Sequence, residues 1–496
     1  MKKIISLSLA LTITMLCSAC SNTTPGSDHT GNDSYAGTTD SNTTAELKAD
    51  IPEDAFYENQ ESHILARGGT GATDWANDDL VVEDDEARGD VVYKAIYDRN
   101  LAIEERLGVK IVHDRVNGHN IAEPVRQAVM SQEHIYDVVM PKITDAATFA
   151  QENILVPLSE MPYMDLSKPW YDQRCIDELE IGGDNYFFFS DITIRHLDAI
   201  WLYYFNKQLI DSYGLEDPYE LVESGKWTMD KMAEMIKAAT IDDGDSKWTK
   251  NDKWGLVAHD YVITASYVGA GERIATANAD GEISLTMNND RVYNVIEKIV
   301  GLQDYWIRYA LTADNYGSAA PVGFEPSDNY AELLNVFTSG NALFMGECMV
   351  AIEDMRQADV EFGLVPSPKL DEEQDEYYSA VNQVAAVMAI PVTNPDLERT
   401  SIIIEALAAE SHDTVRPAYY ETAIKSKYTR DTISAEMLDL ILDSVSYDLG
   451  IYYNWGELSG KFCHLVYNGG EGFASMYDAN VSAAEAALDE FIEVLE

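Results

Sequence analysis

Basic residues are scarce in this sequence. Lys and Arg number 34 against 86 Asp and Glu, which gives a formal net charge of −52 over 496 residues. Such a field repels the phosphates of nucleic acid and anionic lipid headgroups, so we expect no nucleic-acid partner and no attachment to a membrane through bulk charge. The acidity fits a protein that stays soluble outside the cell.

Cysteine is also rare, and it follows no metal-binding pattern. The chain has five cysteines, and the three outside the N-terminal Cys17 and Cys20 (Cys175, Cys348 and Cys463) form no C-x-x-C pair; its nine histidines form no ligand cluster. We therefore predict neither a metal site nor a cofactor. If the first two cysteines belong to a leader, three remain. Buried thiols are the favoured interpretation, and one disulfide stays open.

Motifs that carry catalytic chemistry are missing as well. The sequence contains no G-x-S-x-G, H-E-x-x-H or G-x-x-x-x-G-K-[ST]. Gly69-Thr-Gly71 lacks the third glycine of a dinucleotide fingerprint. With 86 acidic residues, a carboxylate pair at glycosidase spacing is expected by chance and is no evidence of hydrolysis. We expect a protein that is not an enzyme. A polysaccharide-degrading enzyme of the cell surface stays open as an alternative.

The N-terminus has the features of a secretion leader. Met1-Lys-Lys precedes an apolar run from Ile4 to Leu16, which is too short to span a bilayer and ends at Cys17-Ser-Ala-Cys20. This resembles a bacterial lipoprotein signal, so we predict a signal peptide at 1–19 and a palmitate-bearing lipid anchor on Cys20. A plainly secreted protein cut nearby is the alternative. Residues 20–57 are rich in Ser, Thr, Asn and Gly and predict a disordered tether.

An alternating pattern follows the tether. Strands are predicted at 63–66, 109–112 and 136–140, with helices at 89–107 and 123–132 between them. This order predicts a parallel sheet with crossover helices. Ligands bind beyond the carboxyl ends of such strands, which points to the loops that hold Trp75 and Asp145.

The stretch Leu202–Thr240 predicts a strand, a short helix that ends near Gly214, a loop, and a helix that begins at Trp227-Thr228. Its residue sequence, YYFNKQLIDSYGL followed by W-T-M-D-K-M, resembles the inter-lobe crossover of family 1 extracellular solute-binding proteins. Further segments resemble this family in the same order, among them the run Thr338–Met345 and the run Glu361–Lys369.

The resemblance implies an α/β, two-lobed periplasmic-binding-protein-like (type 2) fold with a ligand cleft between the lobes. We expect the first lobe to comprise 58–200 and 317–372, and the second lobe 201–316 and 373–496. In this scheme a strand at Ala342 returns to the first lobe, and the helix Glu398–Glu410 belongs to the second lobe.

The same resemblance implies a lipid-anchored monomeric receptor, held outside the cytoplasmic membrane, that captures a small solute and delivers it to the permease subunits of an ABC importer. We expect a sugar or oligosaccharide. An adhesion or sensory lipoprotein of the same fold is a further alternative.

Sugar-binding clefts need aromatic faces for pyranose rings, and carboxylates or amides for hydroxyl groups. In the loops expected at the cleft we predict eight ligand-binding residues: Trp75, Asp145, Tyr267, Glu347, Tyr378, Asn382, Tyr453 and Trp455. The competing interpretations are a surface-loop or lobe-packing role for Trp75, a helix N-cap for Asp145, a solvated turn for Glu347 and core packing for the other aromatic residues. Trp201 and Trp227 are interpreted as core or hinge packing, and Asp280-Gly281 as the turn of a hairpin.

Overall fold

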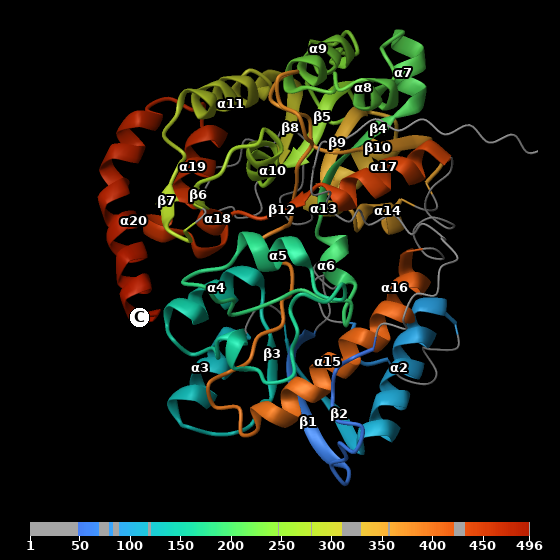
Figure 1. Cartoon of the computed structure of the whole chain (residues 1–496). Coiled ribbons are helices and arrows are strands. Elements are labelled where there is room, and N and C mark those ends of the chain that lie inside the picture. Colours follow the sequence, from blue (N-terminus) through green and yellow to red (C-terminus); the bar gives the residue numbers. More distant parts are fainter. Residues whose placement is uncertain are drawn as a thin grey trace, which may run out of the picture. The chain divides into compact units, whose positions relative to one another are not determined.

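Two β-sheets organise the part of the chain that this computed structural model describes, which comprises residues 48–68, 79–82, 89–117, 121–246, 248–278, 280–309, 329–355, 358–420 and 432–495. Each sheet and its covering helices form one lobe, so the predicted two-lobed α/β architecture is confirmed (Figure 1). The first sheet has the order β2-β1-β3, from β1 (Gln60–Gly68), β2 (Val109–Asn117) and β3 (Val138–Met140). The second has the order β10-β4-β9-β5-β8, from β4 (Trp201–Asn206), β5 (Trp254–His259), β8 (Trp306–Tyr309), β9 (Ala342–Cys348) and β10 (Phe362–Val365).

The first sheet is parallel throughout, as the alternation of strands and helices predicts. The helix α2 (Val91–Leu107) begins at Asp90, whose carboxylate accepts hydrogen bonds from the first-turn amides. It ends at Gly108, whose φ of 57° is a left-handed conformation that glycine adopts at little cost. The helices α3 (Ala122–Met130) and α4 (Ile143–Gln151) complete the crossovers. The carboxyl ends of β1 and β3 therefore lie at one edge of this sheet.

The second sheet is mixed. The strand β4 is antiparallel to its neighbours β10 and β9, whereas β5 is parallel to both β9 and β8. The helix α9 (Met229–Ala239) packs against β5 and β9, as does α13 (Asn329–Thr338) against the same strands. Because β5 and β9 are parallel, their carboxyl ends, His259 and Cys348, lie at the same edge of the sheet.

The stretch Leu202–Thr240 folds as its pattern predicts. After β4 come α7 (Lys207–Tyr213), which ends at Gly214, then α8 (Pro218–Glu223), and then α9, which Thr228 caps. The indole of Trp227 is fully buried, and its Nε1 donates to the carbonyl of Pro366 at 2.8 Å. Trp201 is buried as well. Both tryptophans are packing residues, as predicted.

The expectation that 317–372 belongs to the first lobe is wrong for its two strands. Phe344 in β9 pairs with Phe205 in β4, and Leu364 in β10 pairs with Tyr204. Both strands are thus hydrogen-bonded into the second sheet. Their position depends on pairing with residues more than a hundred positions away, which local pattern does not encode.

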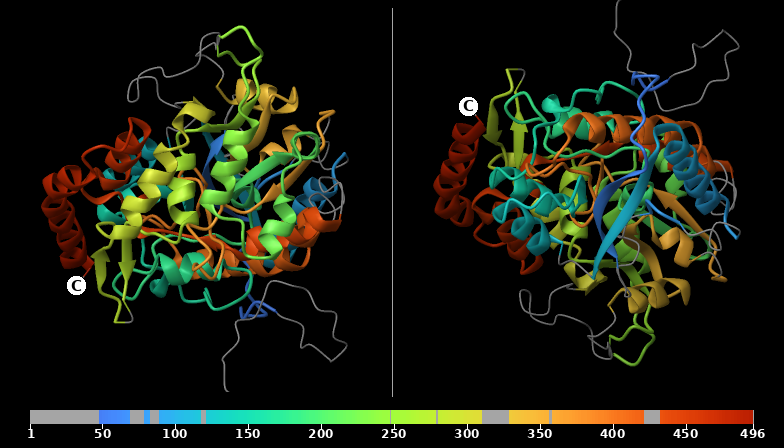
Figure 2. Two further views of the ribbon diagram at one scale, coloured as in Figure 1. Left: turned by 90° about the horizontal axis from the view of Figure 1, so that it is seen from above. Right: turned by 90° about the horizontal axis from the view of Figure 1, so that it is seen from below.

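The expectation that the helix at 398–410 belongs to the second lobe is also wrong. The helix α15 (Leu397–Asp413) packs beside α2, and the right view of Figure 2 shows the orange α15 next to the blue α2. Its Ile402 and Leu407 share a core cluster with Ile64 of β1. Arg399 Nη2 also lies 2.7 Å from the buried Asp137 Oδ1, just before β3. Hydrophobic burial and this ion pair hold α15 to the first sheet.

The remaining elements complete the two lobes and the junction between them. The hairpin β6 (Ala275–Ala277) and β7 (Ile283–Leu285) is antiparallel, so the hairpin interpretation of Asp280-Gly281 is confirmed. The last helix, α20 (Phe473–Leu495), buries Ala484, Leu488 and Phe491 on one face. The other helices are α5 (Gln173–Glu178), α6 (Arg195–Asp198), α10 (Val262–Gly269), α11 (Asp290–Val300), α14 (Ala351–Asp354), α16 (Val415–Pro417), α17 (Thr432–Asp443), α18 (Leu449–Tyr453) and α19 (Leu458–Tyr467), with 3-10 turns at Leu158–Glu160, Gln303–Tyr305 and Trp455–Glu457; a short parallel pair joins β11 (Ser379–Ala380) to β12 (Val445–Ser446).

Two sequence predictions about thiols and membrane spans can be compared with this fold. Cys175, Cys348 and Cys463 are free and buried, which confirms the favoured interpretation and leaves no disulfide among the three. Among the described helices, none combines the length and apolar character needed to cross a bilayer.

Candidate functional site

Three chain segments run side by side where the two sheets meet. Ile200, in the segment that enters β4, forms an antiparallel bridge with Val381. Val381 belongs to the segment that follows β11 and leads back towards the first sheet, which we call the return segment. The carbonyl of Ile200 also accepts a hydrogen bond from the amide of Met349, directly after β9, at 2.9 Å. The segments at Ile200 and Val381 carry the chain between the lobes, and such connections are positions at which hinge bending occurs.

A small cavity lies beside these segments. It has a volume of about 160 Å³, and the first lobe, the crossing segment and the end of β9 all contribute to its lining. Typical sites for drug-sized ligands are larger, about 300–1,000 Å³, so this cavity suits a small solute. Its walls are formed by Asp79, Asp90, Val92 and Tyr93, by Ile194, Arg195 and Asp198, by Met349, Val350, Ile352 and Glu353, and by Tyr419.

Arg195 and Asp198 form the polar centre of the cavity. Arg195 Nη1 donates to Asp198 Oδ2 at 3.1 Å, and the hydroxyl of Tyr419 donates to the other carboxylate oxygen at 2.7 Å. Burial opposes the charged guanidinium, but the carboxylates of Asp198 and Asp79 outweigh it and raise the pKa of Arg195 above its ordinary value. Arg195 is therefore a fixed cation whose charge is already matched within the protein.

Glu347 lies at the edge of the second sheet, buried beneath the crossing segments. Its Oε2 is 2.7 Å from His259 Nε2, and its Oε1 accepts a hydrogen bond from the amide of Cys348 at 2.7 Å. Burial raises the pKa of the Glu347 carboxyl to about 8 and lowers the pKa of the His259 imidazole to about 4. Both shifts favour the uncharged forms of the two side chains. The solvated turn considered for Glu347 is not observed, because the residue is buried.

Asn382 and Asp145 also lie close to the junction. Asn382 Nδ2 donates to Cys348 Sγ at 3.3 Å, and its Oδ1 accepts from the amide of Val384 at 3.1 Å, so this side chain joins the return segment to the end of β9. Asp145 stands in the first turn of α4 with a side chain 19% exposed, 3.4 Å from Lys142 Nζ. It is not the N-cap, which is Lys142.

Three of the predicted aromatic residues lie in the core. Tyr267 is fully buried in α10 and packs on Phe462 with ring centroids 4.9 Å apart. Tyr453 stacks on Trp455 at 5.2 Å, and both are almost fully buried. Core packing, the competing interpretation, describes the surroundings of all three. Trp75 lies outside the described residues.

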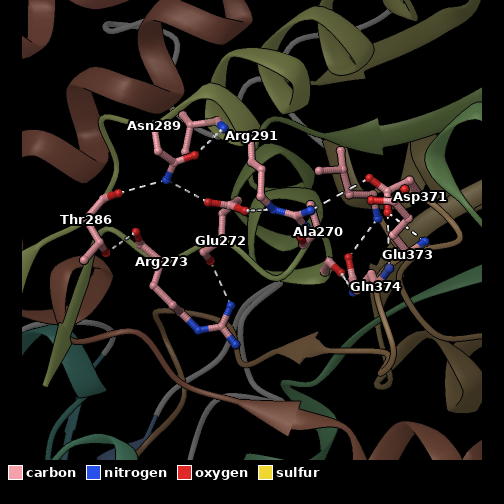
Figure 3. A network of polar contacts seen from close by, with 12 residues as sticks. Ala270, Glu272, Arg273, Thr286, Asn289, Arg291, Asp371, Glu373 and Gln374 are labelled. Atoms are coloured by element: carbon pink, nitrogen blue, oxygen red, sulfur yellow. Dashed lines mark hydrogen bonds and ion pairs between the residues drawn. The ribbon is translucent and has the colours of Figure 1, made fainter. Parts of the chain in front are cut away.

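Tyr378 is held beside the return segment by a polar network. The centre of its ring lies 5.0 Å from the guanidinium carbon of Arg273. Nη1 of the same guanidinium donates to the carbonyl of Glu272 at 2.8 Å. Figure 3 shows the Glu272 side chain between Asn289 and Arg291, which donate to it at 3.0 and 2.6 Å. The network fixes the turn after α10 and thereby sets the position of Arg273 under Tyr378.

One acidic cluster could attract a hard cation. Carboxylate oxygens of Asp242, Asp243 and Asp252 lie within 4.8 Å of one another in the loop before β5. These oxygens already accept backbone hydrogen bonds, for example Asp252 from the amides of Asp243 and Thr249. The loop is at the amino end of β5, away from His259 and the cavity.

The sequence interpretation missed the central residues Arg195, Asp198, His259 and Tyr419. Three of them stand at the ends of buried elements: Arg195 and Asp198 lie just before β4, and His259 ends β5. Charged residues directly before or after an apolar strand were the available signal. The pairing of β9 with β4 and β5 brings the residues before β4, the end of β5 and the end of β9 close together in space, and this pairing is not visible in the local sequence.

Comparison with known proteins supports the fold. No protein-family model matches the chain, and no curated protein matches its sequence. Among solved structures, the cyclic α-maltosyl-1,6-maltose binding protein from Arthrobacter globiformis is 15% identical, with a TM-score of 0.56 over 88% of this chain and 99% of that chain. The GacH receptor of Streptomyces glaucescens, solved unliganded and with acarbose, is 14% identical, with a TM-score of 0.53 over 87% and 98%.

A third similar structure is an ABC transporter solute-binding protein from Agrobacterium radiobacter in complex with ribitol. It is 13% identical to this chain, with a TM-score of 0.53 over 86% of this chain and 99% of that one. At these identities the similarity establishes the fold. This chain has the two-lobed fold of the solute-binding proteins of ABC transporters.

Proposed function

We propose that this protein is a receptor that captures a small polyhydroxylated solute, a sugar or sugar alcohol, between its two lobes and delivers it to an ABC importer. The observation that carries the proposal is the polar cavity beside the crossing segments, with walls from both lobes. Contacts to both lobes let a ligand stabilise a closed form at the expense of an open one, with no chemistry on the ligand. Solved proteins of the same fold that bind acarbose and ribitol support this class of ligand.

The proposal extends to the location of the receptor. The leader that ends at Cys20 supports export and lipid attachment at that residue, with the permease subunits of the importer as partners and a monomeric receptor body. Metabolic labelling with a fatty-acid analogue tests the anchor. Label on the native chain and none on the Cys20→Ala variant is expected, and equal label on both would contradict it.

A thermal-shift screen of neutral sugars and sugar alcohols tests the receptor function. A ligand at about 100 times its Kd adds about 2.7 kcal/mol to the free energy of unfolding. We expect at least one sugar or sugar alcohol to produce such a shift without being consumed. Release of reducing ends from a polysaccharide would instead support a degrading enzyme. The absence of a shift with every solute would favour an adhesion role.

A further inference from the structure

The cavity lining is strongly unbalanced in charge. Among the described residues, four carboxylates line it, those of Asp79, Asp90, Asp198 and Glu353, and Arg195 provides the only guanidinium or amine. Counted formally, four carboxylates against one guanidinium make the lining net negative. A cavity that binds carboxylate or sulfate groups would need the opposite balance, because like charges in a partly desolvated site repel strongly.

Arg195 would be the natural clamp for an anionic ligand, but its surroundings oppose that role. It is bound to Asp198 at 3.1 Å, and Asp198 is held in place by the hydroxyl of Tyr419. The amide of Ile194, next to Arg195 in the chain, donates to Asp79 Oδ2 at 3.0 Å. An incoming carboxylate that approached the guanidinium would therefore meet two carboxylates fixed by hydrogen bonds.

The guanidinium nevertheless keeps donors for a neutral ligand. Its side chain is 23% exposed. Among the described residues, the one hydrogen bond of its side chain runs from Nη1 to Asp198, which leaves Nε and Nη2 to donate to a ligand. The neighbouring walls include the apolar side chains of Val92, Met349 and Ile352, which suit the C–H faces of a polyol.

We propose that this cavity binds an uncharged polyhydroxylated ligand, with Arg195 donating to its hydroxyl groups, and that Asp198 and Asp79 exclude ligands that carry carboxylate or sulfate groups. This inference rests on the proposed receptor function and names its ligand class more narrowly. Arg195 acts as a hydrogen-bond donor whose charge the protein has already neutralised. Specificity against acidic saccharides then comes from repulsion, which is an established way to discriminate between related ligands.

Isothermal titration calorimetry with paired ligands tests this inference. The purified chain is titrated with neutral mono-, di- and trisaccharides and sugar alcohols, and with the uronic-acid counterparts of the saccharides. We expect the neutral ligand that binds best to have a Kd about a hundredfold lower than that of its uronic counterpart, and this ratio to shrink as added salt screens the repulsion. Equal or tighter binding of the uronic ligand would overturn the inference and leave the receptor function standing. If no saccharide or sugar alcohol of either kind binds, both fall.

A variant pair sharpens the test. Asp198→Asn keeps the shape of the side chain and removes one fixed carboxylate beside Arg195, so we expect the neutral-to-uronic ratio to fall by about tenfold. Asp165→Asn is the matched control, because Asp165 forms the same i, i+3 pair with Lys168 on the surface outside the cavity. Its ratio should equal that of the wild type. An unchanged ratio in a folded Asp198→Asn protein would overturn the role of Asp198.

Discussion

His259 Nε2 lies 2.7 Å from Glu347 Oε2 where the parallel strands β5 and β9 end side by side. Burial favours the uncharged form of each side chain, because it raises the pKa of Glu347 to about 8 and lowers the pKa of His259 to about 4. The pair lies beneath the segments that connect the two lobes.

The first prediction concerns pH. A carboxyl whose pKa is raised on folding stabilises the protein below the pKa of the unfolded chain, and this stability is lost as the pH rises towards the folded value. For Glu347 we expect a loss of about 2 kcal/mol in the free energy of unfolding between pH 6 and pH 8. Urea unfolding at both pH values measures it. Glu347→Gln, which does not titrate, should flatten this dependence, and an equal slope in both proteins would contradict the account.

His259 makes the free energy of unfolding depend on pH in the opposite sense, at acidic pH. An imidazole whose pKa is lowered on folding must be protonated when the chain unfolds in acid, so its contribution to stability is lost as the pH falls from about 6.5 to about 4. We expect His259→Gln to reduce the acid sensitivity of the midpoint of urea unfolding. His113, a partly buried histidine of the first sheet, provides the control. If His113→Gln changed the acid sensitivity of the unfolding midpoint as much as His259→Gln, a specific role of the His259–Glu347 pair would be excluded.

The second sheet depends on the Trp227 indole. It is fully buried, packs on Phe344 with ring centroids 5.5 Å apart and donates to Pro366. We expect Trp227→Ala to lower the free energy of unfolding by about 3–5 kcal/mol, as large-to-small core substitutions do. Trp248→Ala is the control, since Trp248 is 43% exposed, and it should cost less than about 1 kcal/mol. Similar losses in the two variants would contradict the packing role of Trp227.

The position of α15 depends on a buried ion pair. Arg399 and Asp137 have side chains only 10% and 5% exposed and lie 2.7 Å apart. Removal of one partner leaves a buried charge, so Asp137→Asn or Arg399→Met should each cost about 3–5 kcal/mol. The double variant should cost less than the sum of the two single variants. Hydrogen exchange should show the loss of protection in β3 and α15. Protection lost only in the second sheet would refute the assignment of α15 to the first lobe.

Local sequence pattern predicted the parts of the fold that short-range chemistry determines. The alternation up to β3, the Gly108 and Gly214 helix ends and the Thr228 cap follow from residues a few positions apart. The placement of β9, β10 and α15 was wrong because it depends on partners such as Phe205 and Ile64, which are far away in sequence. Which lobe a returning segment joins is decided by such long-range pairing.

The candidate site was harder to predict for a related reason. An aromatic residue flanked by Asn or Gly looks the same in sequence whether it faces a cleft or the core, and Trp455 is in the core. Asn382 lies at the junction between the lobes, and Glu347 lies at the edge of the second sheet beneath it. The Arg195–Asp198 pair carries no motif. Only the fold places Tyr419, from the segment after α15, against it.

Arg195 provides the sharpest single-residue test of the cavity. Arg195→Lys keeps the positive charge near Asp198 but removes the planar array of donors, so we expect the affinity for an identified neutral ligand to fall by about tenfold. The melting temperature reports separately on folding. Arg126→Lys is the control, since Arg126 pairs with Glu152 on the surface of the first lobe. Unchanged affinity in a folded Arg195→Lys protein would remove this residue from the site.

Lobe closure on a captured solute is the central claim, and a distance measurement between the lobes tests it most directly. Leu101 in α2 is an exposed position on the first lobe, and Tyr293 in α11 is an exposed position on the second. The native thiols of Cys175, Cys348 and Cys463 are buried. Spin labels on cysteines introduced at positions 101 and 293 therefore report the inter-lobe distance. With the saccharide or sugar alcohol that raises the melting temperature most, we predict a shift of the distance distribution to a shorter, narrower population. A distribution that stays unchanged at saturating ligand would contradict capture between the lobes.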